Sequence, residues 1–218
     1  MNGRLKQIIC VMAVLFSGFA MAQEPTPIVV PAFGDNYSNY VKKLEAGDMH
    51  VDFRAFRESF IESPQFEVAN QQKPVMDSLK RAMYEAMHYK NYAQIISITR
   101  QMLSIDYTCL LAHKILQQTY KYIGDTLNQK KYHDIEFGLL HSIINNGDGK
   151  TCETGWPVIQ IDEEYFILEI QGAKLLQQSM VTEANLCDKM DTQTKEGNKT
   201  FYIETSKVFE GYKKLGLQ

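Results

Sequence analysis

The sequence is poor in the features that mark several large classes of protein. Its 218 residues include four cysteines, six prolines and thirteen glycines, which excludes a disulfide-dense scaffold and a collagen-like chain. The 23 basic residues form no long run and are outnumbered by 26 acidic residues, so the chain lacks the positive patch that non-specific nucleic-acid binding requires. With 44% hydrophobic residues, the chain can bury a core. We therefore expect a soluble globular protein without a nucleic-acid partner.

Motifs for metals and nucleotides are also missing. The five histidines form no H-x-x-x-H pair and have no C-x-x-C partner, so we expect no metal and no cofactor. Gly149-Lys150-Thr151 is like the end of a phosphate-binding loop, but Ile144 stands where that motif requires glycine. Asp148 alone does not make a calcium loop, because the alternating oxygen ligands and the later glutamate are missing. We interpret residues 147–156 as a tight turn.

Residues 1–22 have the three parts of a secretory signal peptide. Two basic residues precede an apolar run at 8–16, and Ala20-Met21-Ala22 gives the small-residue cleavage pattern. We predict cleavage between Ala22 and Gln23. The apolar run is shorter than the roughly 20 residues that cross a membrane, and no later stretch approaches that length. We therefore expect a periplasmic or secreted protein with no integral membrane anchor.

Removal of this signal peptide changes the formal charge and the number of cysteines. The peptide has two basic residues and no acidic ones, so the formal charge changes from −3 to −5 and 196 residues remain. The remaining cysteines are Cys109, Cys152 and Cys187. An odd number in an oxidising compartment indicates one disulfide with one free thiol, or three thiols in a host that rarely forms disulfides. The spacing does not say which pair would form.

The rest of the chain reads as an extended leader, residues 23–36, followed by a single α+β domain, residues 37–218. The leader contains three prolines near its start. In the domain, residues 37–145 have helical spacing of apolar side chains, and residues 146–218 have the pattern of a small antiparallel sheet.

The helical part begins with short helices at 37–47 and 52–62, the second ended by Ser63-Pro64. Between Pro74 and Asn145 four longer helices follow. These four form two helix-turn-helix pairs that match at an offset of 34 residues, a period and a loop type that resemble the tetratricopeptide repeat. The alternative is an ordinary bundle of helical hairpins in accidental register.

The sheet part is predicted to contain strands at 156–161 and 165–170, with the acidic residues 162–164 as a solvated turn between them. A Gly-Asn loop between 185–194 and 200–205 indicates a hairpin, and residues 208–215 indicate a closing helix.

Two sets of candidate site residues stand out. Cys152 follows the turn, and His133 and His141 share a face of the preceding helix, which would suit a thiolate nucleophile with an imidazole base. No cysteine-hydrolase signature surrounds Cys152, and a structural or disulfide-bonded cysteine is the favoured interpretation. The second set consists of aromatic side chains that could line a peptide groove, although most aromatics should be core. The chosen members are Tyr84, Tyr89, Tyr120 and Trp156.

The segment GDGKTCETGWPVIQIDEEYFILEIQG, residues 147–172, is followed by QQSM and by the hairpin CDKMDTQTKEGNKTFYIETSKVF. Together these segments resemble the domain of unknown function 4919 family, exported proteins of Bacteroidetes. The resemblance implies an exported single-domain protein without an assigned activity, and it transfers no catalytic residues.

Two functions from different classes follow. The first is an exported, non-catalytic interaction protein that presents its helical repeat surface to an unknown protein or peptide. The alternative is a cysteine-dependent hydrolase centred on Cys152, with His141 or His133 as the base.

Overall fold

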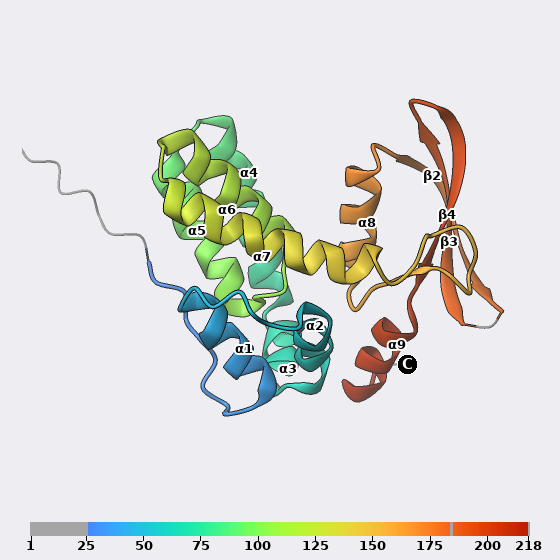
Figure 1. The fold of residues 1–218 in the computed structure, drawn as a ribbon, viewed down its shortest axis with the longest axis horizontal. Coiled ribbons are helices and arrows are strands. Elements are labelled where there is room, and N and C mark those ends of the chain that lie inside the picture. Colours follow the sequence, from blue (N-terminus) through green and yellow to red (C-terminus); the bar gives the residue numbers. More distant parts are fainter. Residues whose placement is uncertain (1–25, 184, 218) are drawn as a thin grey trace, which may run out of the picture.

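The computed structural model describes residues 26–183 and 185–217. The predicted signal peptide and its cleavage site at Ala22 and Gln23 lie outside these residues. Helices occupy the first part of the chain, and a small sheet with two further helices occupies the second (Figure 1). The predicted α+β class, with helices first and the sheet second, is confirmed. Within the described residues, no helix is both long and apolar enough to cross a membrane.

Seven helices precede the sheet in the described chain. They are α1 (Asn36–Glu45), α2 (Phe53–Glu62), α3 (Pro64–Gln71), α4 (Lys73–His88), α5 (Tyr92–Ile105), α6 (Leu110–Ile123) and α7 (Thr126–Ile144). The helices predicted at 37–47 and 52–62, and the four predicted between Pro74 and Asn145, are confirmed as α1, α2 and α4–α7. Consecutive helices from α4 to α7 pack on each other and form two successive hairpins (Figure 1).

Local capping explains where the hairpins turn. Gly124 has a φ of 78°, which glycine adopts without strain, and it ends α6. The Asp125 side chain then accepts the backbone N–H of Asn128 at 3.0 Å and starts α7. Asn91 caps the start of α5 in the same way. The residue before it, Lys90, has a positive φ of 53°.

Helix α3 was missed in the sequence because Ser63-Pro64 was interpreted only as a stop. Ser63 does end α2, but it also lies directly before α3, and Pro64 is the first residue of α3. Proline suits this position because the first helical N–H has no intrahelical partner.

The strands predicted at 156–161 and 165–170 are largely wrong. Only β1 (Trp156–Pro157) is extended, and α8 (Ile161–Ile170) is a helix. A short apolar run is compatible with a buried strand or a buried helix, so periodicity alone did not separate them. The acidic residues 162–164 lie in the first turn of α8, where negative charge favours the positive end of the helix dipole.

The sheet has the strand order β1-β4-β3-β2. Strands β2 (Lys174–Thr182), β3 (Leu186–Thr194) and β4 (Gly197–Glu204) are antiparallel, whereas β1 runs parallel to β4. The sheet is therefore mixed rather than antiparallel. The predicted hairpin is confirmed as β3–β4, and the closing helix as α9 (Ser206–Lys214). Strand β2 was not predicted.

Aromatic side chains fill much of the core where α1, α2 and the α5–α6 turn meet. Tyr37 stacks on Phe56 with ring centroids 5.6 Å apart, and its hydroxyl accepts the backbone N–H of Tyr107 at 2.8 Å. The start of the described chain lies along α5, since Val29 N–H donates to the Ser104 hydroxyl at 2.9 Å.

Candidate functional site

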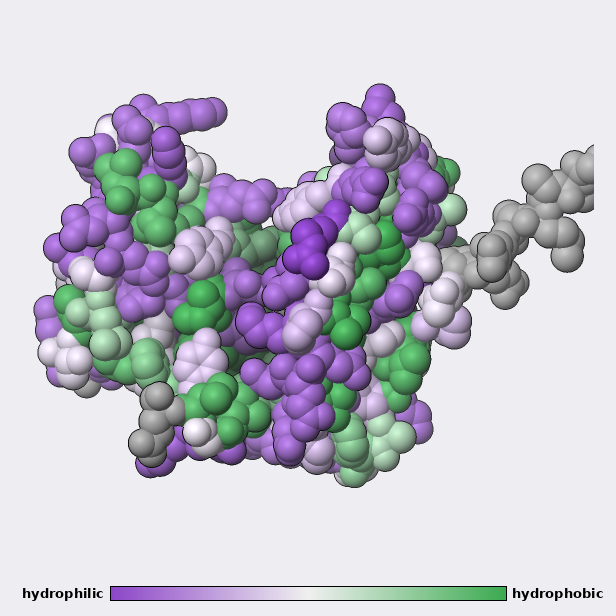
Figure 2. All heavy atoms as spheres, turned by 180° about the vertical axis from the view of Figure 1, so that it is seen from behind, coloured by the Kyte–Doolittle hydropathy of each residue, from purple (hydrophilic) through white to green (hydrophobic). Residues whose placement is uncertain are grey.

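A cleft of about 310 Å³ lies between the helical hairpins and α8. Helix α4 contributes Lys80 and Tyr84, the start of α6 contributes Leu110 and Leu111, and α8 contributes Phe166 and neighbouring polar residues. Figure 2 shows that the surface is hollowed between the helical hairpins and the sheet part. The cleft therefore sits where the two parts of the fold meet.

Asp106 lies at the buried end of this cleft, in the turn between α5 and α6. Its carboxylate accepts the backbone N–H and the hydroxyl of Thr108, at 2.8 and 2.6 Å, and the side-chain amide of Gln160 at 2.9 Å. Burial raises the pKa of Asp106 above its ordinary value, and these hydrogen bonds offset that shift only in part. The arrangement holds the Asp106 carboxyl group rigidly in one orientation.

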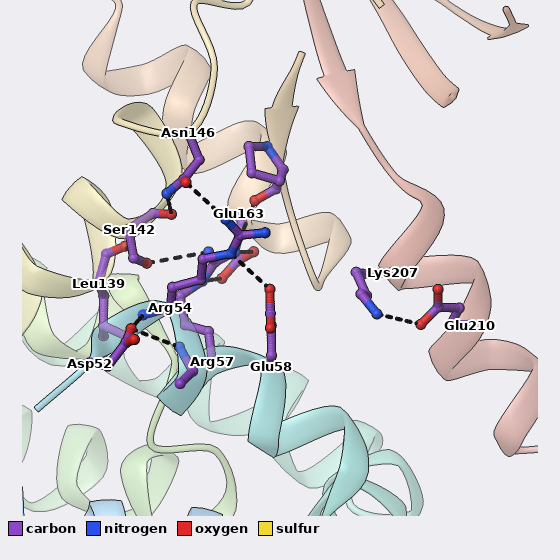
Figure 3. A network of polar contacts seen from close by, with 12 residues as sticks. Asp52, Arg54, Arg57, Glu58, Leu139, Ser142, Asn146, Glu163, Lys207 and Glu210 are labelled. Atoms are coloured by element: carbon purple, nitrogen blue, oxygen red, sulfur yellow. Dashed lines mark hydrogen bonds and ion pairs between the residues drawn. The ribbon is translucent and has the colours of Figure 1, made fainter. Parts of the chain in front are cut away.

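A buried ion pair supports the wall of the cleft. The Arg57 guanidinium on α2 donates to both carboxylate oxygens of Glu163 on α8, at 2.9 and 2.6 Å (Figure 3). Arg57 also donates to the Ser142 hydroxyl, and Glu163 accepts the N–H of Ile159 at 2.8 Å. Fork geometry and these extra bonds satisfy two charges that would otherwise be costly to bury. The prediction that residues 162–164 form a solvated turn is wrong for Glu163.

Glu164, the next residue, points to a different partner because it lies on another side of α8. It is fully buried against the sheet. The Gln178 side-chain amide donates to Glu164 at 3.4 Å and to Asp188 at 2.6 Å. Burial, and then the neighbouring Asp188 carboxylate, raise the pKa of Glu164 to about 8. Glu164 is therefore protonated at neutral pH, and the two adjacent glutamates share no partner.

The rim of the cleft is charged and aromatic. Lys80 pairs with Asp162, and Lys114 pairs with Glu169 at 2.8 Å while lying 5.2 Å from the ring centroid of Phe166. Asp162, Glu163 and Glu169 thus each have a cationic partner. In the described part of the chain, no basic side chain lies within 4 Å of the Asp106 carboxylate. Asp106 is therefore the carboxyl group of the cleft that has no cationic partner.

Cys109 also lines the cleft, and it is the free cysteine of the described chain. Burial, and then the Asp106 carboxylate, raise the pKa of its thiol to about 12. The nucleophilic form of cysteine is the thiolate, so this thiol is unreactive at neutral pH. Cys109 therefore contributes to the lining of the cleft as a small apolar side chain.

The profile of one protein family, described as a domain of unknown function (DUF4919), matches residues 36–214. The chain belongs to this DUF4919 family. The match extends from the first residue of α1 to the last residue of α9, so it includes the cleft and the whole sheet. The family resemblance inferred from the sequence is confirmed, whereas the Bacteroidetes origin stays a prediction. No curated protein and no solved structure matches the chain significantly.

In this DUF4919 chain Cys152 forms a disulfide with Cys187 of β3, across a sequence separation of 35 residues. A disulfide sulfur has no thiolate, so the structure argues against a hydrolase centred on Cys152. His133 and His141 lie beside Phe137 on α7, with ring centroids 6.1 and 3.8 Å from it. The open question of pairing is answered by Cys152–Cys187.

The four predicted binding aromatics separate into two groups. Tyr84 is 54% exposed and lines the cleft, and Tyr89 is 72% exposed but lies outside it. Tyr120 and Trp156 are buried: Tyr120 accepts a hydrogen bond from Arg100 at 2.9 Å, and Trp156 packs on Phe201. Neither of these two rings lines the cleft, so their prediction as binding residues needs correction.

The turn at residues 147–156 is held by Asp148. Its carboxylate accepts the Thr154 hydroxyl at 2.6 Å and the Lys150 N–H at 3.1 Å, bonds that lower its pKa to about 2. Over residues 26–183 and 185–217 there is no group of three or more histidine, cysteine, aspartate or glutamate side chains arranged to hold a metal ion.

Sequence reasoning missed Lys80, Arg57, Glu163 and Asp106. One signal was present for Arg57, which stands between Phe56 and Phe60 on the apolar side of a predicted helix. A charge in that position is buried and needs a partner. The identity of the partner is not a local property.

Proposed function

We propose that the protein is an exported, non-catalytic binding protein that holds a segment of a protein or peptide in the cleft between α4, α6 and α8. The observation that carries this proposal is the Asp106 carboxyl group, which has no cationic partner, inside a cleft of about 310 Å³. A cleft with apolar walls and a few fixed polar groups is the usual form of a ligand site.

The helical repeat supports the choice of surface. Helices α4 and α6 are the first members of the two hairpins that match at an offset of 34 residues, and both line the cleft. In tetratricopeptide-like pairs, stacked helices create a concave binding surface. Here α8 covers part of that surface through Lys114 and Phe166, so the remaining site is a short cleft rather than an open groove.

The charges and rings of the cleft favour a basic side chain as the bound group. An ammonium or guanidinium group would pair with Asp106, and charge-assisted hydrogen bonds of this kind are the strong ones. Tyr84 at the rim, which is 54% exposed, supplies an aromatic face to which a cation is attracted. The proposed partner is therefore a peptide segment with a lysine or arginine.

Export is part of the proposal. It is supported by the signal-like residues 1–22 and by the Cys152–Cys187 disulfide, since disulfides persist in oxidising compartments. Catalysis is not proposed, because Cys152 is bonded and Cys109 is held as a neutral thiol.

The test is selection of peptides from a random heptapeptide display library on the exported protein. Enriched peptides should carry lysine or arginine, and Tyr84→Ala and Asp106→Asn should each weaken their binding about tenfold, equivalent to about 1.4 kcal/mol. Tyr89→Ala is the matched control, because Tyr89 is on the same hairpin, is more exposed and lies outside the cleft. Binding that Tyr89→Ala weakens and Tyr84→Ala does not would contradict the proposal, as would the absence of any enriched peptide.

A further inference from the structure

A second cavity, of about 320 Å³, opens between the α4–α5 turn, α5 and the second half of α6, and we call it the α5–α6 groove. It shares no lining residue with the cleft that contains Asp106. The α4–α5 turn lies at the end of the hairpins that points away from the sheet part (Figure 1). A ligand of this groove is therefore independent of the proposed peptide site. The lining residues are Met87, Lys90, Tyr92, Ile95, Ile115, Gln118, Thr119 and Tyr122.

The base of the groove is apolar, and part of its lining is aromatic. Ile95 and Ile115 are buried, and Met87 packs against the same core. The Tyr92 and Tyr122 rings are stacked, with centroids 6.0 Å apart and an angle of 17° between their planes. Such a surface removes the hydrocarbon part of a ligand from water, and this burial is the main favourable contribution to binding at an apolar site.

The charge of the groove comes from one lysine. Lys90 is the charged residue among those that line it, and no carboxylate is present in the lining. Within residues 26–183 and 185–217, the exposed ammonium group of Lys90 forms no ion pair, and the Gln118 side-chain amide forms no hydrogen bond. A cation without a partner, beside an amide whose N–H groups are available, is complementary to an anionic group.

The backbone at Lys90 also sets this residue apart. Lys90 is the non-glycine residue of the described chain that has a positive φ, and the N–H of Asn91 closes the turn by donating to the carbonyl of Ala86 at 2.9 Å. The turn after α6 closes with the same backbone bond and has Gly124 at the left-handed position. Glycine adopts this conformation without strain, whereas lysine does not. Strained positions of this kind concentrate at ligand sites, which agrees with a role for the Lys90 side chain in the groove.

We propose that the α5–α6 groove binds a small organic acid, whose apolar body packs on Met87, Ile95 and Ile115 and whose carboxylate pairs with Lys90. The Gln118 amide supplies a hydrogen-bond donor to the same carboxylate. The volume of the groove lies at the lower end of the usual range for small-molecule sites, about 300–1,000 Å³, which favours one small molecule over a peptide segment. The ligand is opposite in charge to the group proposed for the cleft, because the cleft offers Asp106 and the groove offers Lys90.

The test is isothermal titration calorimetry of the exported protein with sodium octanoate and with sodium 4-phenylbutyrate, an aliphatic and an aromatic acid. At least one should bind with one molecule per chain and a Kd of about 1 mM or lower. Octan-1-ol, which lacks the charge, and acetate, which lacks the apolar body, should each bind at least about tenfold more weakly. The peptide acetyl-Gly-Gly-Leu presents an apolar group and a carboxylate at its C-terminus, and it should also bind more weakly than the better acid.

Variants of Lys90 place the bound acid in the groove. Lys90→Gly should weaken binding at least about tenfold, whereas Lys90→Arg, which keeps the charge, should change it by less than about threefold. The thermal midpoint of ligand-free Lys90→Gly should not fall below that of the wild type, because glycine relieves the left-handed strain, so lost binding does not report unfolding. Lys121→Gln is the matched control, since Lys121 is an exposed lysine near the end of α6 that does not line the groove. Asp106→Asn, in the separate cleft, should leave acid binding unchanged.

Three results would each overturn the proposal. The first is the absence of binding by both acids, or binding of octan-1-ol or of the peptide as tightly as the better acid. The second is a Lys90→Gly variant that binds the acid as tightly as the wild type. The third is equal weakening by Lys90→Gly and Lys121→Gln, which would indicate a general charge effect rather than a site at Lys90.

Discussion

The helical part, residues 36–145, and the sheet part, residues 146–217, are stabilised by different kinds of interaction. The helical part buries apolar and aromatic side chains from each of its long helices. The sheet part contributes fewer apolar side chains to the same core, and it depends in addition on the Cys152–Cys187 disulfide, on the Arg57–Glu163 ion pair with α2, and on a protonated glutamate between α8 and the sheet.

This difference in stabilising interactions indicates which part unfolds first. Removing one contact costs little where many apolar side chains pack together, whereas a part with fewer apolar contacts depends more on each specific link. We therefore expect the sheet part to be the less stable one. The single tryptophan, Trp156 in β1, reports on the sheet part by fluorescence, and far-UV circular dichroism reports mainly on the helices.

The largest effect is expected from breaking the buried ion pair. Arg57→Met leaves the Glu163 carboxylate buried without its cation, which should lower the free energy of unfolding by about 3–5 kcal/mol in urea titrations. Arg54→Met is the matched control: Arg54 pairs with Glu58 at 3.0 Å on the surface of the same helix (Figure 3), and its loss should cost less than about 1 kcal/mol. If both variants lose the same free energy of unfolding, the Arg57–Glu163 ion pair does not link the helical part to the sheet part.

The second prediction concerns the disulfide. Cys152→Ala with Cys187→Ala should lower the free energy of unfolding by about 2–4 kcal/mol, because the closed loop restricts the unfolded chain. The fluorescence transition should move to lower urea than the dichroism transition. Cys109→Ala should separate the two transitions much less, since its thiol forms no disulfide. Transitions that stay coincident in the double variant would show that the two parts unfold as one unit.

The third prediction is a pH dependence. The pKa of Glu164 is about 8 in the folded protein against an ordinary value of 4.5, so between these pH values the folded state holds a proton that the unfolded state has lost. Stability from this group is therefore lost as the pH rises from about 5 to 9. In Glu164→Gln the side chain stays neutral, and the decline between pH 5 and pH 9 should shrink by on the order of 4 kcal/mol, because the two pKa values differ by about 3.5 and each unit corresponds to about 1.4 kcal/mol.

The matched control for this prediction is Glu169→Gln, on the exposed side of the same helix. It should leave the wild-type decline between pH 5 and pH 9 largely in place. A Glu164→Gln variant that declines as steeply as the wild type would remove Glu164 from the explanation.

The smallest effect is expected inside the helical part. Asp125→Ala removes the side-chain cap of α7 and should cost about 1 kcal/mol, observed in the dichroism transition. Asp134→Ala, in the middle of the same helix, removes only the pair with Lys130 and should cost about 0.5 kcal/mol or less. A loss above about 3 kcal/mol in Asp125→Ala would show that the helical part also depends on single links.

The sequence predicted the helical hairpins well because their signals are local. Apolar spacing, the Gly124-Asp125 turn and the Asn91 cap each act over a few residues. The same local reasoning failed at α8, where an apolar run preceded by acidic residues fits more than one element. Half of the predicted binding aromatics were wrong for a related reason, since Tyr120 and Trp156 have the composition of a groove but the burial of a core.

The sequence by itself determined the helical pairs, the β3–β4 hairpin and the family, because these depend on short-range patterns. Only the tertiary structure decided which charges are buried together. Arg57 and Glu163 are 106 residues apart, and Gln160 reaches Asp106 across 54 residues. The need for a partner is visible in the sequence, but the partner itself is selected by packing, because burying a lone charge costs more than any local preference can supply.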